Sequence, residues 1–185
     1  GEGMGHIVMA ARSNPDITVI LHNNQVYGLT TGQSSPTALK GSVSKTYPNG
    51  VADEPVNPIQ LMLTLGGSHV LRGFSGDIDH LTEMISKGLK HRGFSLVDVL
   101  QPCVTFNKLN TYAWFRERIK KLESPESSRI EALKQAVWTN EQILIGEFFA
   151  ENKAVLGDNY PQLQGKTLLS LGRQGTMERL FAENK

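Results

Sequence analysis

Apolar and polar residues follow one another along the first part of the chain in stretches that predict a helix and then a strand. Residues 5–14 have apolar side chains at helical spacing, and the helix should end at Asn14 because a residue that precedes proline disfavours the α region. Residues 17–21 form a short apolar run rich in β-branched side chains, which favours a fully buried strand. Polar residues begin again at His22, so the strand should end there.

Helix-like and strand-like stretches keep alternating up to residue 107. We predict a helix over residues 58–65, with proline in its first turn, and strands over residues 68–74 and 94–100. Between these strands Asp77 is the expected N-cap of a further helix, since its carboxylate can accept from main-chain N–H groups of the first turn. The apolar residues of that helix keep helical spacing: Ile78, Leu81, Ile85 and Leu89.

Other stretches lack this alternation. Residues 33–57 are rich in Gly, Ser, Thr, Pro and Asn and have no periodicity, which predicts a long loop that is either a functional cover or disordered. Residues 109–122 predict a basic amphipathic helix whose charges are either a solvated face or a docking patch for an acidic electron carrier. Ser128 and Glu131 predict the capping box of another helix.

The alternation over residues 1–107 predicts an α/β fold, with a doubly wound, mostly parallel sheet covered by helices on both faces. Residues 108–185 are predicted to be a helical and irregular C-terminal extension that packs on this core or on a partner subunit. Sheets of this kind bind ligands at the carboxyl ends of their strands. The segments that follow the predicted strands are therefore the candidate sites.

The composition is that of a soluble globular protein and excludes several other classes. The chain has 185 residues, of which 39% are hydrophobic and 20% charged, enough for one core of ordinary size. A net charge of +1 creates no global field that would attract nucleic acid or a membrane surface. No apolar run is long enough to cross a bilayer, and a single cysteine cannot form an intramolecular disulfide, so we expect a cytoplasmic protein.

The segment that follows the first strand has the residue types of a phosphate and cation site. Residues 23–33 bring together a pair of adjacent asparagines, two threonines and two glycines at the end of a predicted strand. Amide and main-chain carbonyl oxygens suit a hard divalent cation, while hydroxyls and main-chain N–H groups freed by glycine suit phosphate. For Asn24 alone, an equally simple reading is a turn amide that bonds its own backbone.

Two stretches resemble one family in detail. Residues 4–19, the triplet at 22–24 and residues 27–37 closely resemble the β subunit of 2-oxoacid:ferredoxin oxidoreductases, which bind thiamine diphosphate. Residues 101–107 are similar to the segment of that family that supplies one cysteine to a [4Fe-4S] cluster. The last third of the chain resembles the family only loosely.

The resemblance implies roles for particular residues. The side chain of Asn24 and the main-chain carbonyl of Val26 would coordinate Mg²⁺, and Cys103 would be a ligand of the [4Fe-4S] cluster in the full-length subunit. Read without the family, Cys103 is a small buried residue, because one thiolate cannot hold a cluster. His6 would hydrogen-bond the phosphate, and His22 would either do the same or face the core. The thiamine diphosphate itself would be bound by the turn that follows: Tyr27, Gly28, Leu29, Thr30 and Thr31.

The family pattern is incomplete in this sequence. Its third Mg²⁺ ligand is the aspartate of a Gly-Asp-Gly motif, and Glu2 lies several residues beyond the place where that aspartate belongs. The chain therefore reads as the C-terminal portion of a longer subunit and should be inactive alone. No catalytic residue is assigned, because in thiamine enzymes the glutamate that activates the cofactor comes from a partner domain.

By resemblance, the parent subunit would take part in the oxidative decarboxylation of a 2-oxoacid to an acyl-coenzyme A. Electrons would pass through the iron-sulfur cluster to ferredoxin, in a hetero-oligomer with an α subunit. The 2-oxoacid is not readable from the sequence. Two alternatives remain open: a non-oxidative thiamine enzyme of the decarboxylase or acetolactate synthase type, which has no use for a cluster, and a cofactor-free assembly subunit.

Overall fold

The computed structural model describes residues 1–139, 141–161 and 165–171, and a five-stranded sheet lies at its centre in the order β1-β5-β4-β7-β6. Strands β1, β5 and β4 run parallel, β7 is antiparallel to β4, and β6 is parallel to β7. The strands of this sheet are β1 (Thr18–Asn23), β4 (His69–Phe74), β5 (Ser95–Leu100), β6 (Ile119–Lys121) and β7 (Ile143–Ala150). A separate two-stranded sheet consists of β2 (Val26–Tyr27) and β3 (Gln33–Ser34).

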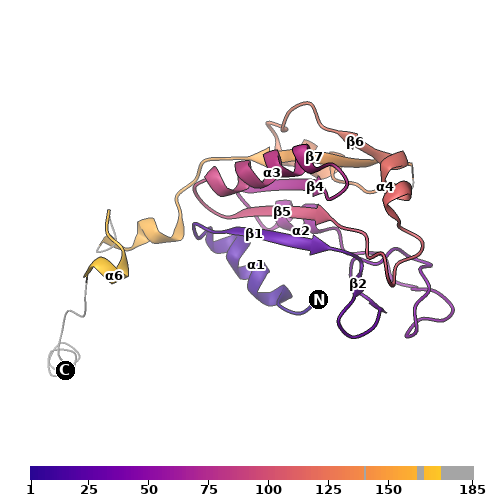
Figure 1. Cartoon of the computed structure of the whole chain (residues 1–185). Coiled ribbons are helices and arrows are strands. Elements are labelled where there is room, and N and C mark those ends of the chain that lie inside the picture. The colour runs from indigo at the N-terminus through magenta and orange to yellow at the C-terminus, as the bar shows by residue number, and fades with distance from the viewer. Residues whose placement is uncertain (140, 162–164, 172–185) are drawn as a thin grey trace, which may run out of the picture.

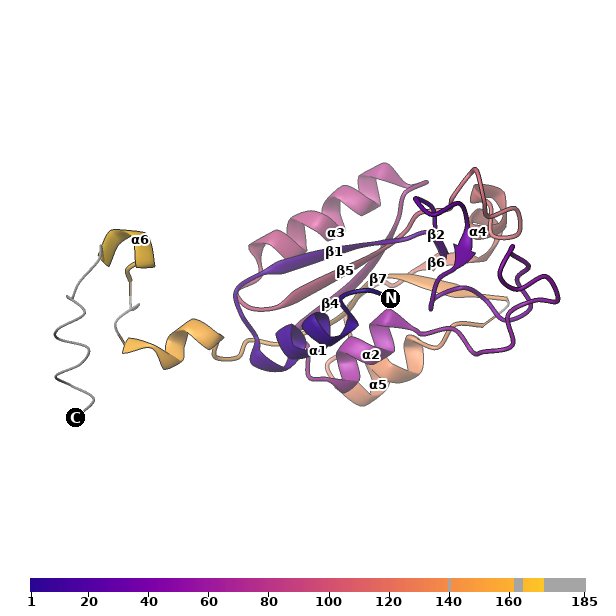
Figure 2. The ribbon, with the colours of Figure 1, turned by 90° about the horizontal axis from the view of Figure 1, so that it is seen from below.

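Helices cover both faces of the large sheet. Figure 2 shows α3 above the sheet and α1, α2 and α5 below it. The helices are α1 (Met4–Ser13), α2 (Pro58–Thr64), α3 (Ile78–Lys90), α4 (Tyr112–Arg118), α5 (Arg129–Gln135) and α6 (Leu168–Leu171), with a 3-10 turn, η1 (Leu156–Asn159). The prediction of a doubly wound, mostly parallel α/β sheet is confirmed.

Strands β4 and β5 are buried on both faces because their side chains alternate between two cores. Val70 and Leu96 belong to the core under α1, α2 and α5, whereas Leu71 and Val97 belong to the core under α3. A Cβ atom at Gly88 would lie 2.9 Å from Cγ2 of Val97. The absence of a side chain there lets α3 approach the sheet closely.

Local rules located the helix that covers this face. Asp77 caps α3 as predicted, since its Oδ1 accepts from the main-chain N–H of His80 at 3.2 Å. The predicted apolar residues of α3 are only partly buried, since Ile78 and Leu89 are 65% and 66% exposed. Met84, which the prediction left out, is buried against the sheet instead.

The prediction that residues 17–21 form a fully buried strand is wrong. Among the described residues, β5 is the only strand that pairs with β1, so β1 lies at the edge of the sheet. Ile17 and Ile20 are 44% and 37% exposed. Apolar composition gave the strand correctly but could not tell an edge strand from an inner one.

The prediction for the C-terminal part is wrong in two places. The helix expected over residues 109–122 is confined to α4, and the chain then turns extended at Ile119 and forms β6. Residues 143–150, expected in a helical and irregular extension, form β7, which is the longest strand of the sheet. Ser128 caps α5 as expected through its Oγ, which accepts from Ile130 N at 3.3 Å, but Glu131 bonds Lys134 instead.

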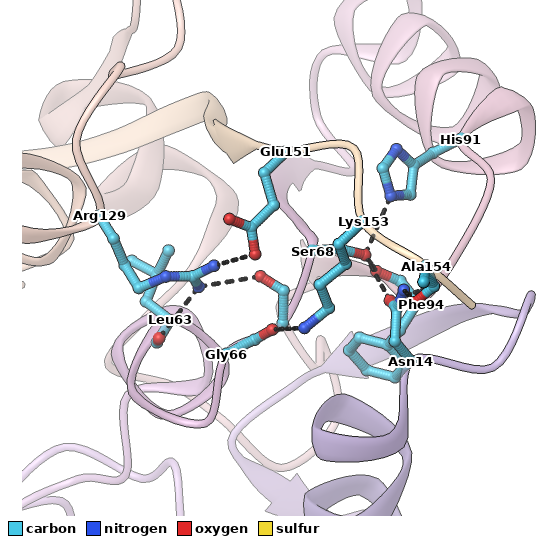
Figure 3. Close-up of polar contacts among 11 residues, drawn as sticks. Asn14, Leu63, Gly66, Ser68, His91, Phe94, Arg129, Glu151, Lys153 and Ala154 are labelled. Atoms are coloured by element: carbon cyan, nitrogen blue, oxygen red, sulfur yellow. Dashed lines mark hydrogen bonds and ion pairs between the residues drawn. The ribbon is translucent and has the colours of Figure 1, made fainter. Parts of the chain in front are cut away.

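Polar contacts hold the segment after β7 against the end of the sheet at which the parallel strands β1, β4 and β5 begin (Figure 3). Oδ1 of Asn14 accepts from Ser68 Oγ at 2.7 Å and from Phe94 N at 2.9 Å, and its Nδ2 donates to the carbonyl of Ala154 at 3.0 Å. Nζ of Lys153 donates to Gly66 O at 2.6 Å. η1 still contacts the body, since Leu156 N donates to Asn14 O at 3.0 Å, and the described chain beyond it extends from this end of the sheet, away from the strands' carboxyl ends (Figure 1).

In the part of the chain that the structure describes, none of the helices has the length and apolar character needed to span a bilayer.

Candidate functional site

The carboxyl ends of β1, β5 and β4 meet at one end of the sheet, together with the β2–β3 hairpin and α4 (Figure 1). A cavity of about 420 Å³ lies there, bounded by the chain's first residues, the end of β1 and the loop after β3. The following predicted site residues line it: Asn24, Val26, Tyr27, Gly28, Leu29 and Thr30. We call residues 24–32 the cofactor turn and residues 101–110 the cysteine loop.

Asn24 and Val26, the two predicted cation ligands, lie side by side in this cavity. Oδ1 of Asn24 accepts from the main-chain N–H of Val26 at 3.1 Å, which is the turn-amide arrangement. An amide oxygen has two lone pairs, so this bond orients the Asn24 side chain and leaves Oδ1 able to accept or coordinate once more. The turn-amide reading and the ligand reading are therefore compatible.

The rest of the cofactor turn lines the cavity up to Thr30, whereas Thr31 and Gly32 do not line it. Thr31 N donates to Gly28 O at 3.2 Å and Gly32 N donates to Tyr27 O at 3.0 Å, which closes the turn on itself. Leu29 is fully exposed at its tip. Thr31 has a φ of 76°, a left-handed conformation that is strained for a β-branched residue and is characteristic of ligand-binding segments.

Asn23 has a different role from its neighbour. It is buried, its Nδ2 donates to Oδ1 of Asp98 at 3.1 Å, and its Oδ1 accepts from Oγ1 of Thr37 at 2.7 Å. Asp98 also accepts from Nε of Arg72 at 2.8 Å, and Arg72 donates to Oδ1 of Asn57 at 3.1 Å. This buried polar network ties the long loop and the start of α2 to three parallel strands just behind the cavity.

Sequence reasoning missed this network, although one signal was available. Arg72 and Asp98 are opposite charges at the fourth position of two six-residue apolar strands, where they pair in register. A charged residue inside such a strand needs a partner, since an unpaired buried charge is very costly. Thr37 and Asn57 carry no comparable signal, because they lie in irregular chain.

The structure shows where three residues named in the sequence analysis lie: His6, Glu2 and His22. His6 is exposed and lines a neighbouring apolar cavity between α1, β1 and α2, not the cavity that holds Asn24. Glu2 lines both cavities. His22 does not face the core: it is exposed, and its Nδ1 shares a 2.7 Å hydrogen bond with Oε1 of Gln101.

Cys103 lies in the cysteine loop, which begins directly after β5 and reaches the cofactor turn. Its thiol is half-buried and free, and the main-chain N–H of Phe106 lies 3.5 Å from Sγ. Asn107 Nδ2 donates to Oε1 of Gln25, in the cofactor turn, at 3.2 Å. The two segments that the sequence singled out are thus in contact.

The polar groups of the site are mostly neutral oxygen and nitrogen groups, set among apolar side chains. Of the described residues that line its cavity, Glu2 is the only carboxylate. Within the described ranges no three His, Cys, Asp or Glu side chains gather as a metal site, so a cation here would be held mainly by amide and carbonyl oxygens.

The most perturbed carboxylate of the structure lies away from this cavity. Glu147 on β7 accepts from His69 Nε2 at 2.9 Å and pairs with Lys87 Nζ at 3.1 Å. The hydrogen bond from His69, assisted by Lys87, lowers the pKa of Glu147 to about 2. This cluster joins β4, β7 and α3 and serves the fold rather than the cavity.

Two family models match successive parts of the chain. The family described as thiamine pyrophosphate enzyme, C-terminal TPP binding domain, matches residues 2–99. The family that describes the C-terminal part of the pyruvate ferredoxin oxidoreductase beta subunit matches residues 103–165. The first match includes the cofactor turn, and the second begins at Cys103.

Known relatives agree with these matches. A 2-oxoacid:ferredoxin oxidoreductase subunit beta from Sulfolobus sp is 48% identical over 124 residues, which cover 67% of this chain and 41% of the relative. A 2-oxoacid:ferredoxin oxidoreductase 1, subunit beta, from Aeropyrum pernix is 38% identical over 162 residues, covering 80% of this chain and 51% of the relative. The chain thus spans about half the length of these relatives or less.

A solved structure extends the agreement to the fold. It is a 2-oxoglutarate:ferredoxin oxidoreductase from Magnetococcus marinus with 2-oxoglutarate, coenzyme A and succinyl-CoA bound. The two chains are 29% identical and superpose with a TM-score of 0.85, over 99% of this chain and 63% of the other. The superposition therefore includes β6, β7 and the segment that leaves the sheet.

Proposed function

The chain belongs to the thiamine pyrophosphate enzymes, by its match to their C-terminal TPP-binding domain, and from this we propose that it is the cofactor-binding part of a 2-oxoacid:ferredoxin oxidoreductase β subunit. The observation that carries the proposal is the contact between the cofactor turn and the cysteine loop at the carboxyl edge of the sheet. A redox enzyme that passes electrons from thiamine diphosphate to a cluster needs these two segments near one another.

The residues of the cavity fit thiamine diphosphate held through Mg²⁺. We propose that the Asn24 amide oxygen and the Val26 carbonyl coordinate the cation, because the two groups are adjacent and hard oxygen donors suit Mg²⁺. The diphosphate would be bound by main-chain N–H groups and hydroxyls of the turn that follows: Tyr27, Gly28, Leu29, Thr30 and Thr31. His6, which lines the neighbouring cavity, is proposed to reach the phosphate only when the cofactor spans both cavities.

When bound, thiamine diphosphate supplies the nucleophilic carbanion chemistry that decarboxylation of a 2-oxoacid requires. The residues of this chain would orient the diphosphate. The strained turn at Thr31 is closed by its own N–H, which donates to Gly28 O, so the main-chain donors would come from the residues that precede it. The buried network behind Asn23 keeps the turn and the two ends of the long loop in fixed positions, so little reorganisation of these parts is needed on binding. No residue of the chain is proposed as general acid or base.

We propose that Cys103 is one ligand of a [4Fe-4S] cluster whose other thiolates come from the rest of the subunit. A half-buried, free thiol directly after a strand end, beside the cofactor turn, supports this role. The match that begins at Cys103 favours the oxidative reaction over a non-oxidative thiamine enzyme.

The proposed assembly follows from the same family. Residues 1–107 would be the diphosphate-binding core and residues 108–185 an extension that completes the sheet and contacts an α subunit. Ferredoxin, coenzyme A and a 2-oxoacid are the proposed electron acceptor and substrates, in a cytoplasmic hetero-oligomer.

Removal of the proposed cation ligand tests the cofactor site. In the full-length complex we expect Asn24→Ala to raise the dissociation constant of thiamine diphosphate about tenfold or more, because a lost oxygen ligand weakens the hold on Mg²⁺. Isothermal titration calorimetry with Mg²⁺ present measures this, and Asn49→Ala, at an exposed position of the long loop, is the matched control. Equal affinities for Asn24→Ala and the parent would refute the assignment.

Removal of the thiol tests the cluster. In the full-length complex we expect Cys103→Ala to lower the iron content or to change the cluster's electron paramagnetic resonance signal, while the affinity for thiamine diphosphate stays the same. Electron transfer to ferredoxin should fall in parallel. An unchanged signal with full iron content would return Cys103 to the status of a structural residue.

A further inference from the structure

Gln25 is an unusual residue for its position between the two proposed cation ligands. Its side chain is only 3% exposed, and its backbone has a φ of 63°, in the left-handed region. This conformation is unfavourable for a residue with a side chain and persists only where other contacts compensate. The main-chain carbonyl of Gln25 accepts from Ser35 N at 3.2 Å, and its side-chain Oε1 accepts from Nδ2 of Asn107 at 3.2 Å.

The same two segments touch at a second point. Gly32, at the end of the cofactor turn, is buried, and its φ of 100° lies in the region that favours glycine. A Cβ atom built there would lie 2.8 Å from Cδ1 of Phe106, closer than real contacts allow. The turn therefore lies flush against the Phe106 ring, and a side chain at position 32 would push the cysteine loop away.

Asn107 connects this contact to the thiol. Its main-chain N–H donates to Cys103 O at 3.1 Å, and its Oδ1 accepts from Leu109 N at 3.2 Å and Asn110 N at 2.9 Å. Phe106 N lies 3.5 Å from the Cys103 sulfur. The loop is thus a short, internally bonded unit, so a displacement of Asn107 moves Cys103 with it.

From these contacts we propose that Gln25 and Asn107 are positioning residues, which lock the cysteine loop to the cofactor turn and thereby set where the Cys103 sulfur stands. The inference rests on the proposed function, in which the turn and Cys103 hold the two redox groups. Electron transfer between such groups depends on their separation and orientation. A direct lock between the two segments preserves both when the surrounding loops move.

The hydrogen bond between residues 25 and 107 can form with either side chain as the donor. If the carboxamide of Gln25 turns over, its Nε2 takes the place of Oε1 and becomes the donor; in the structure Nε2 is buried without a hydrogen-bond partner among the described residues. Asn107→Asp keeps the two acceptor contacts to Leu109 and Asn110 and can accept from the turned Gln25. Gln25→Met keeps the length of the side chain and can do neither.

The first measurement is the labelling rate of the chain's single cysteine by a coloured aromatic disulfide reagent. For the full 185-residue chain, with folding verified by circular dichroism, Gln25→Met should be labelled about threefold to tenfold faster than the parent, the change that the loss of one buried hydrogen bond makes in a local opening equilibrium. Asn107→Asp should stay close to the parent rate. Leu109→Ala, an exposed side chain of the same loop, is the control and should not differ from the parent.

The second measurement uses the assembled holo-complex. Gln25→Met should shift the cluster's midpoint potential or its paramagnetic resonance spectrum, whereas Asn107→Asp, which can still bond Gln25, should keep the parent signature. A residue that only stabilised the fold would lower the yield of complex without changing the signature of what assembles.

The proposal is overturned if folded Gln25→Met is labelled at the parent rate. Where Gln25→Met does not fold, Phe106→Ala removes the second contact from a 38% exposed position, and a parent-like rate for that variant overturns the proposal in the same way. Failure of the proposed function is separately visible. A parent complex without iron would refute the cluster but leave the labelling rates, which need no cluster, to decide the lock.

Discussion

The buried ion pair between Arg72 and Asp98 should dominate the stability of the inner strands. Arg72 is 1% exposed and Asp98 is fully buried, and Arg72 Nε donates to Asp98 Oδ2 at 2.8 Å. The other two nitrogens of the guanidinium bond only neutral oxygens, at Asn57 and Leu144. Asp98→Asn would therefore leave a buried positive charge with no negative partner among the described residues, which typically costs about 3–5 kcal/mol.

The cost belongs at the lower end of this range, because the hydrogen bonds can rearrange. The amide that Asp98→Asn introduces can accept from Arg72 and donate to Asn23, provided that the Asn23 amide turns over and donates to Thr37 Oγ1. What is lost is then the charge alone, about 3 kcal/mol. Arg72→Met/Asp98→Asn removes both charges and should be less destabilised than the sum of the two single variants, since an apolar side chain of similar volume replaces the guanidinium.

Urea unfolding of the full chain measures the free energy of unfolding of the single variants and of the double variant. The fluorescence of Trp138 is a local probe, because its ring centroid lies 5.4 Å from the Arg72 guanidinium carbon. Far-ultraviolet circular dichroism reports the unfolding of the whole sheet. The reasoning is refuted if Asp98→Asn costs less than about 1 kcal/mol. It is also refuted if the double variant costs as much as the two single variants together.

Two further predictions concern acid stability and the long loop. His69, with Lys87, lowers the pKa of Glu147 from 4.5 to about 2, so the carboxylate stabilises the fold above pH 4.5 and this stability, at most about 3 kcal/mol, is lost as the pH falls towards 2. Glu147→Gln should flatten the pH dependence of urea unfolding in that window, and an unchanged slope would contradict the assignment. Trypsin should cut the isolated chain first at Lys45, which is exposed in residues 35–57, and holo-complex formation should suppress the cut; equal resistance in both states would mean that the loop does not close over a ligand.

Elements that depend on local rules could be predicted from the sequence. The helix that ends before Pro15 and the helix that begins after Asp77 were located within a residue, because caps and proline act on their nearest neighbours. The long loop after β3 was also expected, since residues 35–57 contain no strand or helix. In each case the deciding interaction spans only a few residues.

Elements that depend on partners far along the chain could not be predicted. β6 has three residues and becomes a strand only because β7 lies beside it. The exposure of Ile20 depends on which strands border β1, and the burial of Asp98 depends on Arg72, which is 26 residues away along the chain. Neither periodicity nor propensity contains this information.

The Asn23-Asn24 pair shows where the family resemblance and the physical reading meet. Successive residues at a strand end point to opposite sides, so two adjacent amides meet different partners. The strand's register places Asn23 beside the buried Asp98, to which it donates a hydrogen bond. Asn24 lies at the cavity, and its side-chain oxygen is oriented by the N–H of Val26. The buried charges behind the site hold the first amide, and that anchoring makes the second available to a ligand. A mostly neutral site is thus held in place by charges that lie behind it, and the proposed binding of a divalent cation with a diphosphate would use this rigidity.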